Sequence, residues 1–408
     1  MIRSNFIIIL VIGVLISIDI QQTSAQEITY PIGYHDFNED AGFNFQMNRW
    51  LSMGYARYED FMEVGPSIKS FDDWTKSMLV LAEKAEADKR LLNAAFYYRA
   101  AELFLFHEAE SDQVNAPTKE QLYKKFIDVF YGAVESYDLE IIEVPYGETT
   151  IQSIRLKALN GKKKGSIVIH GGYDSYKEEL FSMMIFFQQH GYDVITFESP
   201  WMGSSRNKKD MGFDIEWEKP VGAILDYFNL DNVTLIGISM GGWLSLRAAA
   251  FEPRIKRVVA SSVSFDVNQY ANKFGQAMAR FMLNKLPRFT NKTMLKQMEK
   301  DLSYAWFANH LMYVTDKDIP IEAFKVLTTI NEENLHSDLV TQDVLILTGE
   351  EDHMVPVKMH HMQMEALNNA QSLTGHIFTE KEHGQNHCQV GNLGLAFETI
   401  LNWILIER

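Results

Sequence analysis

One stretch decides the fold: Val233-Thr234-Leu235-Ile236-Gly237-Ile238-Ser239-Met240-Gly241-Gly242. An apolar, β-rich run leads into a Gly-x-Ser-x-Gly motif, and a helix-like run, Trp243 to Ala250, follows it. This order predicts a sharp strand-to-helix turn that holds Ser239 in a strained backbone conformation. Glycines at positions 237 and 241 fit such a turn because the neighbouring chain passes close to them. Ser239 is therefore predicted to be a nucleophile whose hydroxyl lies above the sheet.

Short apolar segments alternate with helical stretches around this turn. The predicted strands are Glu140 to Val144, Thr150 to Leu156, Ser166 to Ile169, Asp193 to Phe197, Val233 to Ile236, Val258 to Ser261 and Val344 to Leu347. Such alternation implies an α/β fold with a mostly parallel sheet covered on both faces. The alternation stops over residues 262–335, where Met, Phe and Tyr are frequent, as at Phe274, Met278 and Phe281. This segment is predicted to be a helical lid inserted into a catalytic domain over residues 138–408.

The chain before the first predicted strand has a helical pattern. From about Gln26 to Tyr137, apolar residues recur at steps of three and four, with almost no strand signal. One helix is predicted to begin at the capping box Ser70-Phe71-Asp72-Asp73. Residues 26–137 are therefore predicted to form an all-helical N-terminal cap domain.

The first 25 residues are typical of a secretory signal peptide. Arg3 precedes the apolar run Phe6 to Ile18, and small residues at Thr23-Ser24-Ala25 suit a signal peptidase. The run is shorter than the roughly 20 apolar residues that span a bilayer. Cleavage before Gln26 is therefore favoured over a stable membrane anchor, and a secreted or periplasmic location follows. The single cysteine, Cys388, excludes an intramolecular disulfide.

The charge of the chain restricts its partners. The formal net charge is -16 at pH 7, which argues against nucleic acid and anionic lipid surfaces because phosphate contacts require clustered Lys and Arg. The expected partner is a small-molecule substrate that is neutral or weakly polar, and no cofactor is expected. The oligomeric state stays open, and a homodimer is compatible with these features.

The loop after the strand ending at His170 is predicted to help bind an oxyanion. It reads His170-Gly171-Gly172-Tyr173-Asp174, and its glycines allow backbone N–H groups to approach a substrate oxygen. One oxyanion donor is predicted to be the backbone N–H of Met240, at a helix N-terminus. The second is predicted to be that of Tyr173, or else of Gly172. His170 is expected to hold the loop rather than to act as a base.

A serine hydroxyl is a weak nucleophile at neutral pH, so a general base and an orienting acid are required. After such a turn, the acid and then the histidine are expected later in the chain. Asp352 is the predicted acid, and its neighbours Glu350 and Glu351 are the alternatives. His387 is the predicted base because it lies just before a terminal amphipathic helix, and His383 is the alternative.

Three further features of the sequence concern the site. Five histidines gather late in the chain, at positions 353, 360, 361, 383 and 387, but no His-Glu-x-x-His or paired-cysteine spacing accompanies them, so no metal site is expected. Cys388 is expected to be a buried, inert thiol. Trp201 and Met202, which follow the strand ending at Phe197, are predicted to line a substrate pocket.

Three motifs together resemble one branch of the α/β-hydrolases: Gly171 to Glu179, Gly237 to Gly242, and His387-Cys388-Gln389-Val390-Gly391-Asn392. That branch includes 2,6-dihydroxypseudooxynicotine hydrolase and fungal hydrolases that shorten polyketide pigment precursors. The resemblance implies an eight-stranded sheet, an N-terminal helical cap that here includes Ala94 to Glu102, and a triad of Ser239, Asp352 and His387. It also implies ester hydrolysis or cleavage of a carbon–carbon bond next to a ketone.

The predicted function is a serine hydrolase that cleaves a small ester or an activated ketone through an acyl-enzyme. Both reactions begin with attack on a carbonyl, so the triad does not distinguish them. An exopeptidase is the alternative enzyme, in which Glu63, Glu102 or Glu108 binds a free amine. A catalytically silent ligand-binding protein is the alternative outside the enzymes.

Overall fold

The computed structural model describes residues 28–106, 117–161, 163–206, 208 and 211–406. The predicted signal peptide over residues 1–25 lies outside these residues and stays a prediction. Glu108, one of the carboxylates suggested for binding an amine, also lies outside them. Within the described part of the chain, no helix is both long enough and apolar enough to cross a membrane.

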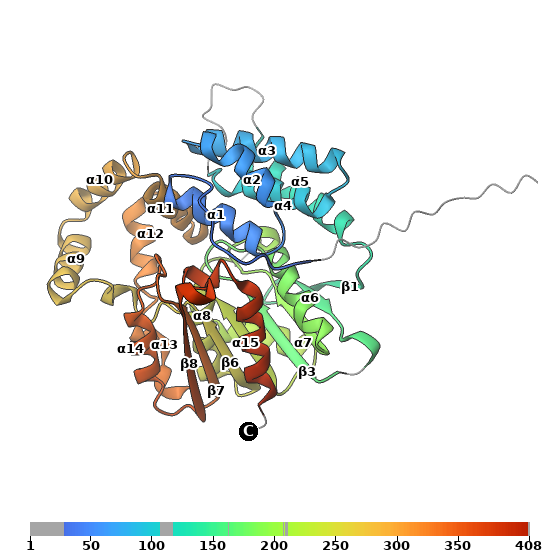
Figure 1. The fold of residues 1–408 in the computed structure, drawn as a ribbon. Helices are drawn as coiled ribbons and strands as arrows, with labels where there is room; N and C mark the ends of the chain where they lie inside the picture. Colours follow the sequence, from blue (N-terminus) through green and yellow to red (C-terminus); the bar gives the residue numbers. More distant parts are fainter. Residues whose placement is uncertain (1–27, 107–116, 162, 207, 209–210, 407–408) are drawn as a thin grey trace, which may run out of the picture.

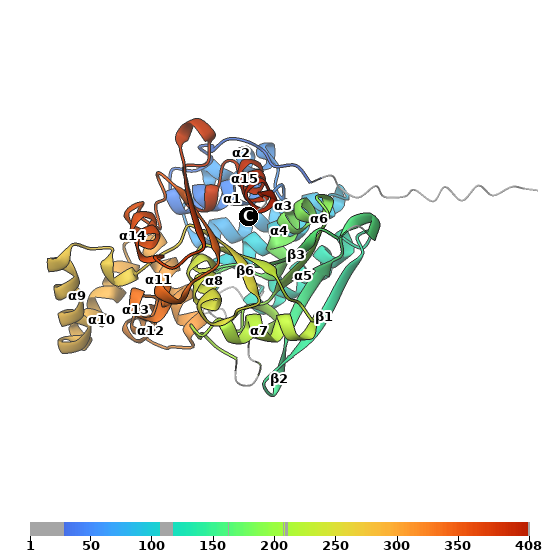
Figure 2. The same cartoon turned by 90° about the horizontal axis from the view of Figure 1, so that it is seen from below.

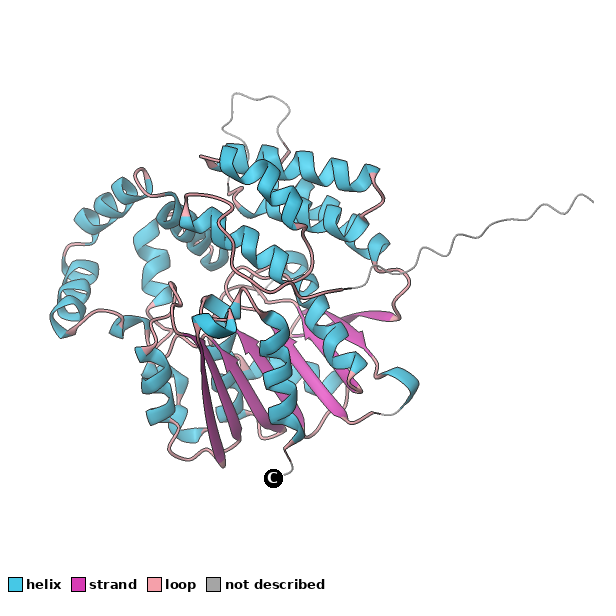
Figure 3. Cartoon of the chain, in the orientation of Figure 1, coloured by secondary structure: helices cyan, strands magenta, loops and turns pink. Residues whose placement is uncertain are grey.

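An eight-stranded, mostly parallel sheet forms the centre of the molecule, which confirms the predicted fold class (Figure 3). Its strand order is β1-β2-β4-β3-β5-β6-β7-β8. The β1–β2 and β2–β4 pairs are antiparallel and the other pairs are parallel. The strands are β1 (Leu139–Tyr146), β2 (Thr149–Leu156), β3 (Gly165–His170), β4 (Tyr192–Phe197), β5 (Val233–Ile238), β6 (Ile255–Ser261), β7 (Asp343–Gly349) and β8 (Ser372–Phe378). The loops that follow the parallel strands therefore meet at one edge of the sheet.

Helices cover both faces of this sheet. They are α6 (Phe181–Gln189), α7 (Glu218–Tyr227), α8 (Met240–Phe251), α14 (Lys358–Ala366) and α15 (Leu393–Leu405). Figure 2 shows α6 and α15 on one face and α7 and α8 on the other. The central strands β3, β4, β5 and β7 are almost entirely buried, as their continuous apolar runs require.

Within the described residues, five α-helices precede the sheet and lie beyond the edge where the parallel strands end (Figure 1). They are α1 (Ala41–Ser52), α2 (Tyr58–Val64), α3 (Phe71–Ala87), α4 (Leu91–Leu103) and α5 (Lys119–Ala133). At the start of α3 the Ser70 side chain accepts from the Asp73 N–H, as predicted, and the Asp73 carboxylate accepts from the Ser70 hydroxyl and the Lys69 N–H. We refer to α1–α5 as the N-terminal helices.

Five more helices lie between β6 and β7. They are α9 (Lys273–Lys285), α10 (Pro287–Met298), α11 (Leu302–Thr315), α12 (Pro320–Leu327) and α13 (Glu332–Leu335). In Figures 1 and 2, α9 and α10 stand at the outer edge of the molecule, away from the sheet. No residue of α9 is buried, and Met294 is the buried residue of α10. We refer to α9–α13 as the inserted helices.

The N-terminal helices depend on an aromatic core centred on Phe96 of α4. Phe96 is fully buried and stacks on Tyr55, with ring centroids 3.5 Å apart. Its ring also contacts those of Trp50, Phe126 and Phe130. This side chain therefore joins α1, α4 and α5.

We predict that Phe96→Ala lowers the free energy of unfolding by about 3 to 5 kcal/mol, because it leaves a cavity between three helices. Urea unfolding followed by circular dichroism measures this change. Val80→Ala, at a position on α3 that is 59% exposed, is the control and should change the free energy by less than about 0.5 kcal/mol. Equal effects of the two substitutions would contradict the packing described above.

Candidate active site

The turn between β5 and α8 holds Ser239 in a rare backbone conformation. Its φ is 61° and its ψ is -125°, a region that L-residues seldom occupy. A Cβ atom on Gly237 would lie 2.0 Å from the Gly241 carbonyl oxygen, and one on Gly241 would lie 2.4 Å from the Gly171 carbonyl oxygen. Both positions therefore require glycine because backbone passes directly against them.

The three residues predicted as a triad form a continuous chain of hydrogen bonds. Ser239 Oγ lies 2.9 Å from His387 Nε2, and His387 Nδ1 lies 2.8 Å from an Asp352 carboxylate oxygen. An ionised Asp352 accepts from Nδ1–H, which leaves Nε2 free to accept the serine proton. The alternatives do not join this chain: Glu350 accepts from the Glu380 N–H, and His383 ends a short turn with a φ of 57°.

The interaction between Asp352 and His387 makes the imidazole of His387 more basic. Burial alone would lower the pKa of His387, but the charge of Asp352 and their hydrogen bond raise it well above its usual value of 6.5. Burial likewise opposes ionisation of Asp352, yet the imidazole and backbone hydrogen bonds leave the pKa of this carboxyl below its usual value. Two of these bonds come from the N–H groups of Met354 and Val355.

Residues at the C-terminal end of β6 hold the Ser239 turn and the segment of His387 in place. The Ser239 N–H donates to the Ser261 carbonyl, and the Ser261 hydroxyl donates to the Gln389 side chain at 2.8 Å. The Ser262 hydroxyl accepts from the Cys388 N–H at 2.9 Å, and it also lowers the pKa of Asp352 by a hydrogen bond. Ser262 and Gln389 carry no recognisable signal in the sequence, because a serine after a strand and a glutamine after a histidine are common.

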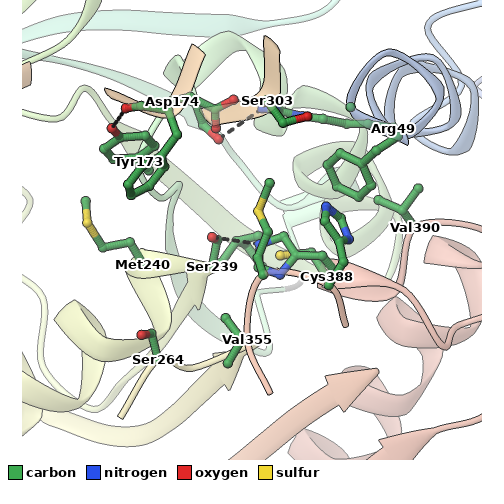
Figure 4. Close-up of a pocket in the computed structure, with 18 of the residues that line it drawn as sticks. Arg49, Tyr173, Asp174, Ser239, Met240, Ser264, Ser303, Val355, Cys388 and Val390 are labelled. Carbon is green, nitrogen blue, oxygen red and sulfur yellow. Dashed lines mark hydrogen bonds and ion pairs between the residues drawn. The ribbon is translucent and has the colours of Figure 1, made fainter. Parts of the chain in front are cut away.

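The loop after β3 lies directly against the turn that carries Ser239. A Cβ atom on Gly172 would lie 2.9 Å from Ser239 Cβ and 3.0 Å from the Met240 backbone nitrogen. Met240 is the first residue of α8, so its N–H has no acceptor within the helix. Among the described residues, neither this N–H nor that of Tyr173 has a hydrogen-bond partner. Figure 4 shows Ser239 between Met240 and Cys388, with Tyr173 across from them.

Two arginines of the N-terminal helices hold this loop. Arg49 of α1 pairs with Asp174 at 2.6 Å and with Glu179 at 2.5 Å. Arg99 of α4 pairs with Glu179 at 2.8 Å and donates to the Asp174 carbonyl oxygen at 2.6 Å. Burial opposes ionisation of Asp174, but the charge of Arg49 holds its pKa at about 2. We call these four residues the loop clamp; its arginines are absent from the predicted site.

The inserted helices hold the same loop from the other side. The Tyr173 hydroxyl donates to the Phe307 carbonyl oxygen at 2.8 Å, and His310 Nε2–H donates to the Tyr173 carbonyl oxygen at 3.2 Å. Beneath the loop, His170 is fully buried and accepts from the Trp217 indole N–H at 3.2 Å. Burial lowers the pKa of His170 to about 3, so this side chain is neutral and supports the loop.

Ser239 and His387 open into a cavity of about 730 Å³. Its wall is largely apolar and comes from the N-terminal helices, the inserted helices and α15, with Phe45, Trp306 and Phe397 among the lining residues. His353 also lines it, between Phe45 and His387, and burial lowers the pKa of His353. A cavity with these walls suits a small apolar molecule that carries few polar groups.

Two expectations about the lining differ from the structure. Trp201 and Met202 are each 1% exposed and do not line the cavity. The Trp201 ring packs instead on Phe213 and Trp217, which lie in the segment just before α7. Cys388 is half-buried and lines the cavity, so the expectation of a buried thiol is wrong.

Two of the three carboxylates suggested for binding a free amine, Glu63 and Glu102, are engaged elsewhere. Glu102 is fully buried and pairs with Arg99 and Lys119 at 2.5 Å each. Glu63 pairs with Lys84 at the surface. Within the described residues, no cluster of three or more His, Cys, Asp or Glu is placed to hold a metal ion.

With this geometry in place, comparison with known proteins assigns the family. Residues 167–374, just over half of the chain, match the family described as alpha/beta hydrolase fold. The chain therefore belongs to this family and is a hydrolase.

Curated relatives and a solved structure extend this similarity. Hydrolyase poxO of Penicillium oxalicum is 27% identical over 271 residues, which are 57% of this chain and 63% of that one. 20-hydroxy-prefusarin hydrolase FUS2 of Gibberella moniliformis is 24% identical over 408 residues, 89% of this chain and 95% of that one. The crystal structure of 2,6-dihydroxy-pseudo-oxynicotine hydrolase has a TM-score of 0.63 at 19% identity, covering 88% of this chain and 94% of that chain. This structure shares the fold.

We predict that Gly172→Ala slows the reaction of Ser239 with a fluorophosphonate probe by about 100-fold. The added methyl would displace the loop from the Met240 N–H, and the loss of one oxyanion donor costs on this order. The measurement is the second-order rate of labelling at fixed pH.

Gly132→Ala is the matched control, since a Cβ atom there meets nothing within 4 Å. It should label at the wild-type rate and should be slightly more stable, because Gly132 lies within α5. A wild-type rate for Gly172→Ala would show that the loop after β3 does not shape the site.

Proposed function

We propose that this hydrolase is a serine hydrolase in which Ser239 attacks a substrate carbonyl. One observation carries the proposal: a chain of hydrogen bonds runs from Ser239 through His387 to Asp352 at the wall of an apolar cavity. His387 takes the proton of the serine hydroxyl, and Asp352 orients the imidazole and stabilises the imidazolium that forms.

The oxyanion of the tetrahedral intermediate requires donors that are already in position. The N–H of Met240 is one donor, and the N–H of Tyr173, or that of Gly172, is the second. His387 then protonates the leaving group, and an acyl group remains on Ser239. A water molecule, deprotonated by His387, releases the acid and restores the serine.

The substrate class follows from the cavity and from the relatives. The apolar wall and the volume of about 730 Å³ favour a small organic molecule over a peptide chain. FUS2 is named as a hydrolase of 20-hydroxy-prefusarin, and the solved structure as a hydrolase of 2,6-dihydroxy-pseudo-oxynicotine. We therefore assign a small ester or an activated ketone as the substrate. For the ketone, the bond that breaks is the carbon–carbon bond beside the carbonyl.

The proposal predicts that a fluorophosphonate probe labels Ser239 in the wild-type protein, located by mass spectrometry of the digested chain. Ser239→Ala removes the nucleophile and should abolish labelling. His387→Ala removes the base and should slow labelling by several orders of magnitude.

Ser303→Ala is the matched control, since Ser303 also lines the cavity but is not hydrogen-bonded to a histidine in the described structure. It should label like the wild type. Labelling of folded Ser239→Ala at the wild-type rate, or no labelling of the folded wild type, would refute the proposal.

The pH dependence of labelling tests the base. Only neutral His387 accepts the serine proton, so the rate should rise as pH increases through its pKa and level off above it. Because the pKa of His387 is raised well above 6.5, the midpoint of this rise should lie above pH 6.5.

Asp352→Asn removes the charge that raises the pKa of His387, so that burial dominates and the midpoint moves to lower pH. The plateau rate should fall by about 10⁴-fold because the imidazole loses its orienting acceptor. A midpoint that stays in place in Asp352→Asn would contradict the assigned role of Asp352.

A further inference from the structure

The surface of α9 and α10 carries a charge opposite to that of the whole chain. The formal net charge is -16, yet residues 273–300 contain seven Lys and Arg and a single carboxylate, Glu299. The cations are Lys273, Arg280, Lys285, Arg288, Lys292, Lys296 and Lys300, and all seven are exposed. None of them forms an ion pair with another residue that the structure describes. The positive charge of this surface is therefore available to a partner.

Large apolar side chains are exposed on the same two helices. On α9, Phe274, Met278 and Phe281 are 75%, 45% and 51% exposed, and their spacing of four and three residues places them on one face. On α10, Phe289 and Leu295 are 60% and 45% exposed. Exposed apolar residues gathered in this way mark an interaction surface.

The cations and the apolar residues are interleaved. Arg288, Lys292 and Lys296 recur every four residues along one face of α10, and Phe289 and Leu295 flank that face. α9 begins with Lys273 beside Phe274 and ends with Lys285, on the face of Phe281. A partner must therefore offer negatively charged groups and apolar groups next to one another.

We propose that α9 and α10 dock on the surface of an anionic lipid bilayer. Helices with apolar aromatic residues and basic residues side by side lie in the interface of a bilayer, where acyl chains meet phosphate groups. Nucleic acid and acidic proteins offer the charge but would leave five large apolar side chains without cover. The negative charge of the rest of the chain opposes docking weakly, because salt screens it beyond about 10 Å.

The position of these helices fits such docking. α9 and α10 stand at the outer edge of the molecule in both views (Figures 1 and 2), so a flat surface can reach them. The opposite face of α9 lines the cavity and carries Gln276, Ala279 and Leu283, together with Arg280, the one of the seven cations that faces the cavity. If the proposed function holds, docking therefore places the cavity beside the acyl chains in which apolar substrates dissolve.

Sedimentation of the full chain with lipid vesicles tests the proposal. The protein should bind vesicles of equal parts phosphatidylglycerol and phosphatidylcholine, and should bind pure phosphatidylcholine vesicles far more weakly. Binding should weaken as salt is added. Ser239→Ala should bind as the wild type does, so the result is independent of catalysis.

Two variants test the charged residues and the apolar residues of the surface separately. Arg288→Glu combined with Lys292→Glu and Lys296→Glu should weaken vesicle binding by at least about 100-fold, since each cation near an anionic surface contributes roughly fivefold. Phe274→Ser combined with Phe281→Ser should weaken it by a similar factor through loss of apolar burial. None of these five residues lines the cavity.

The matched control reverses the charge of three exposed lysines elsewhere on the chain by combining Lys76→Glu, Lys124→Glu and Lys256→Glu. It should leave binding within about twofold of the wild type, because these side chains lie outside the docking surface. Unchanged thermal unfolding and fluorophosphonate labelling of each variant establish that it is folded.

Three results would overturn the proposal. The first is equal binding to anionic and neutral vesicles, and the second is equal loss in the control and the α10 variant. The third is a homodimer in sedimentation velocity that the Phe274 and Phe281 substitutions dissociate, with no vesicle binding by the wild type. That result would assign the surface to a second copy of the chain.

Discussion

The structure depends on the close passage of backbone at the turn that carries Ser239. Gly237 touches the Gly241 carbonyl and Gly241 touches the Gly171 carbonyl, so the end of β5, the start of α8 and the loop after β3 form one packed unit. Holding Ser239 at a φ of 61° costs about 1 to 3 kcal/mol. Burial of the apolar side chains of the central strands, which hold the turn, offsets this cost.

The N-terminal helices belong to the site as much as the sheet does. Through the loop clamp, Arg49 and Arg99 fix the loop after β3, whose Gly172 lies against Ser239. Both arginines are buried, and a buried cation left without its carboxylates is strongly destabilising. The positions of the helices, the loop and the Ser239 turn are therefore linked. A substitution in the loop clamp should shift the proposed oxyanion donors.

Much of the fold and the central residues could be predicted from sequence because their signals are local. The Gly-x-Ser-x-Gly turn needs its glycines, and apolar runs such as Val344 to Leu347 are typical of buried parallel strands. Strand β8 gave no such signal, because Ser372 to Phe378 is a half-exposed edge strand. Helix α1 lies within the segment predicted to be helical, but its bounds could not be predicted, because its buried face includes Asn44 and Asn48, which hydrogen-bond backbone groups of the preceding segment.

Properties that depend on tertiary packing could not be predicted from sequence. The loop with Trp201 was expected beside the substrate because it follows a parallel strand, but it packs on Trp217 instead. The net charge of -16 likewise conceals the positive surface of α9 and α10, because a total charge does not show where the charged residues lie.

The central claim is that Ser239 becomes acylated during turnover, and rapid-quench mass spectrometry of the protein with an activated ester tests it most directly. The hydrogen-bonded chain from Ser239 to Asp352 predicts a burst of acylation on the peptide that contains Ser239, absent in Ser239→Ala. Turnover of the ester with no acyl group on Ser239, or acylation of another residue, would contradict it.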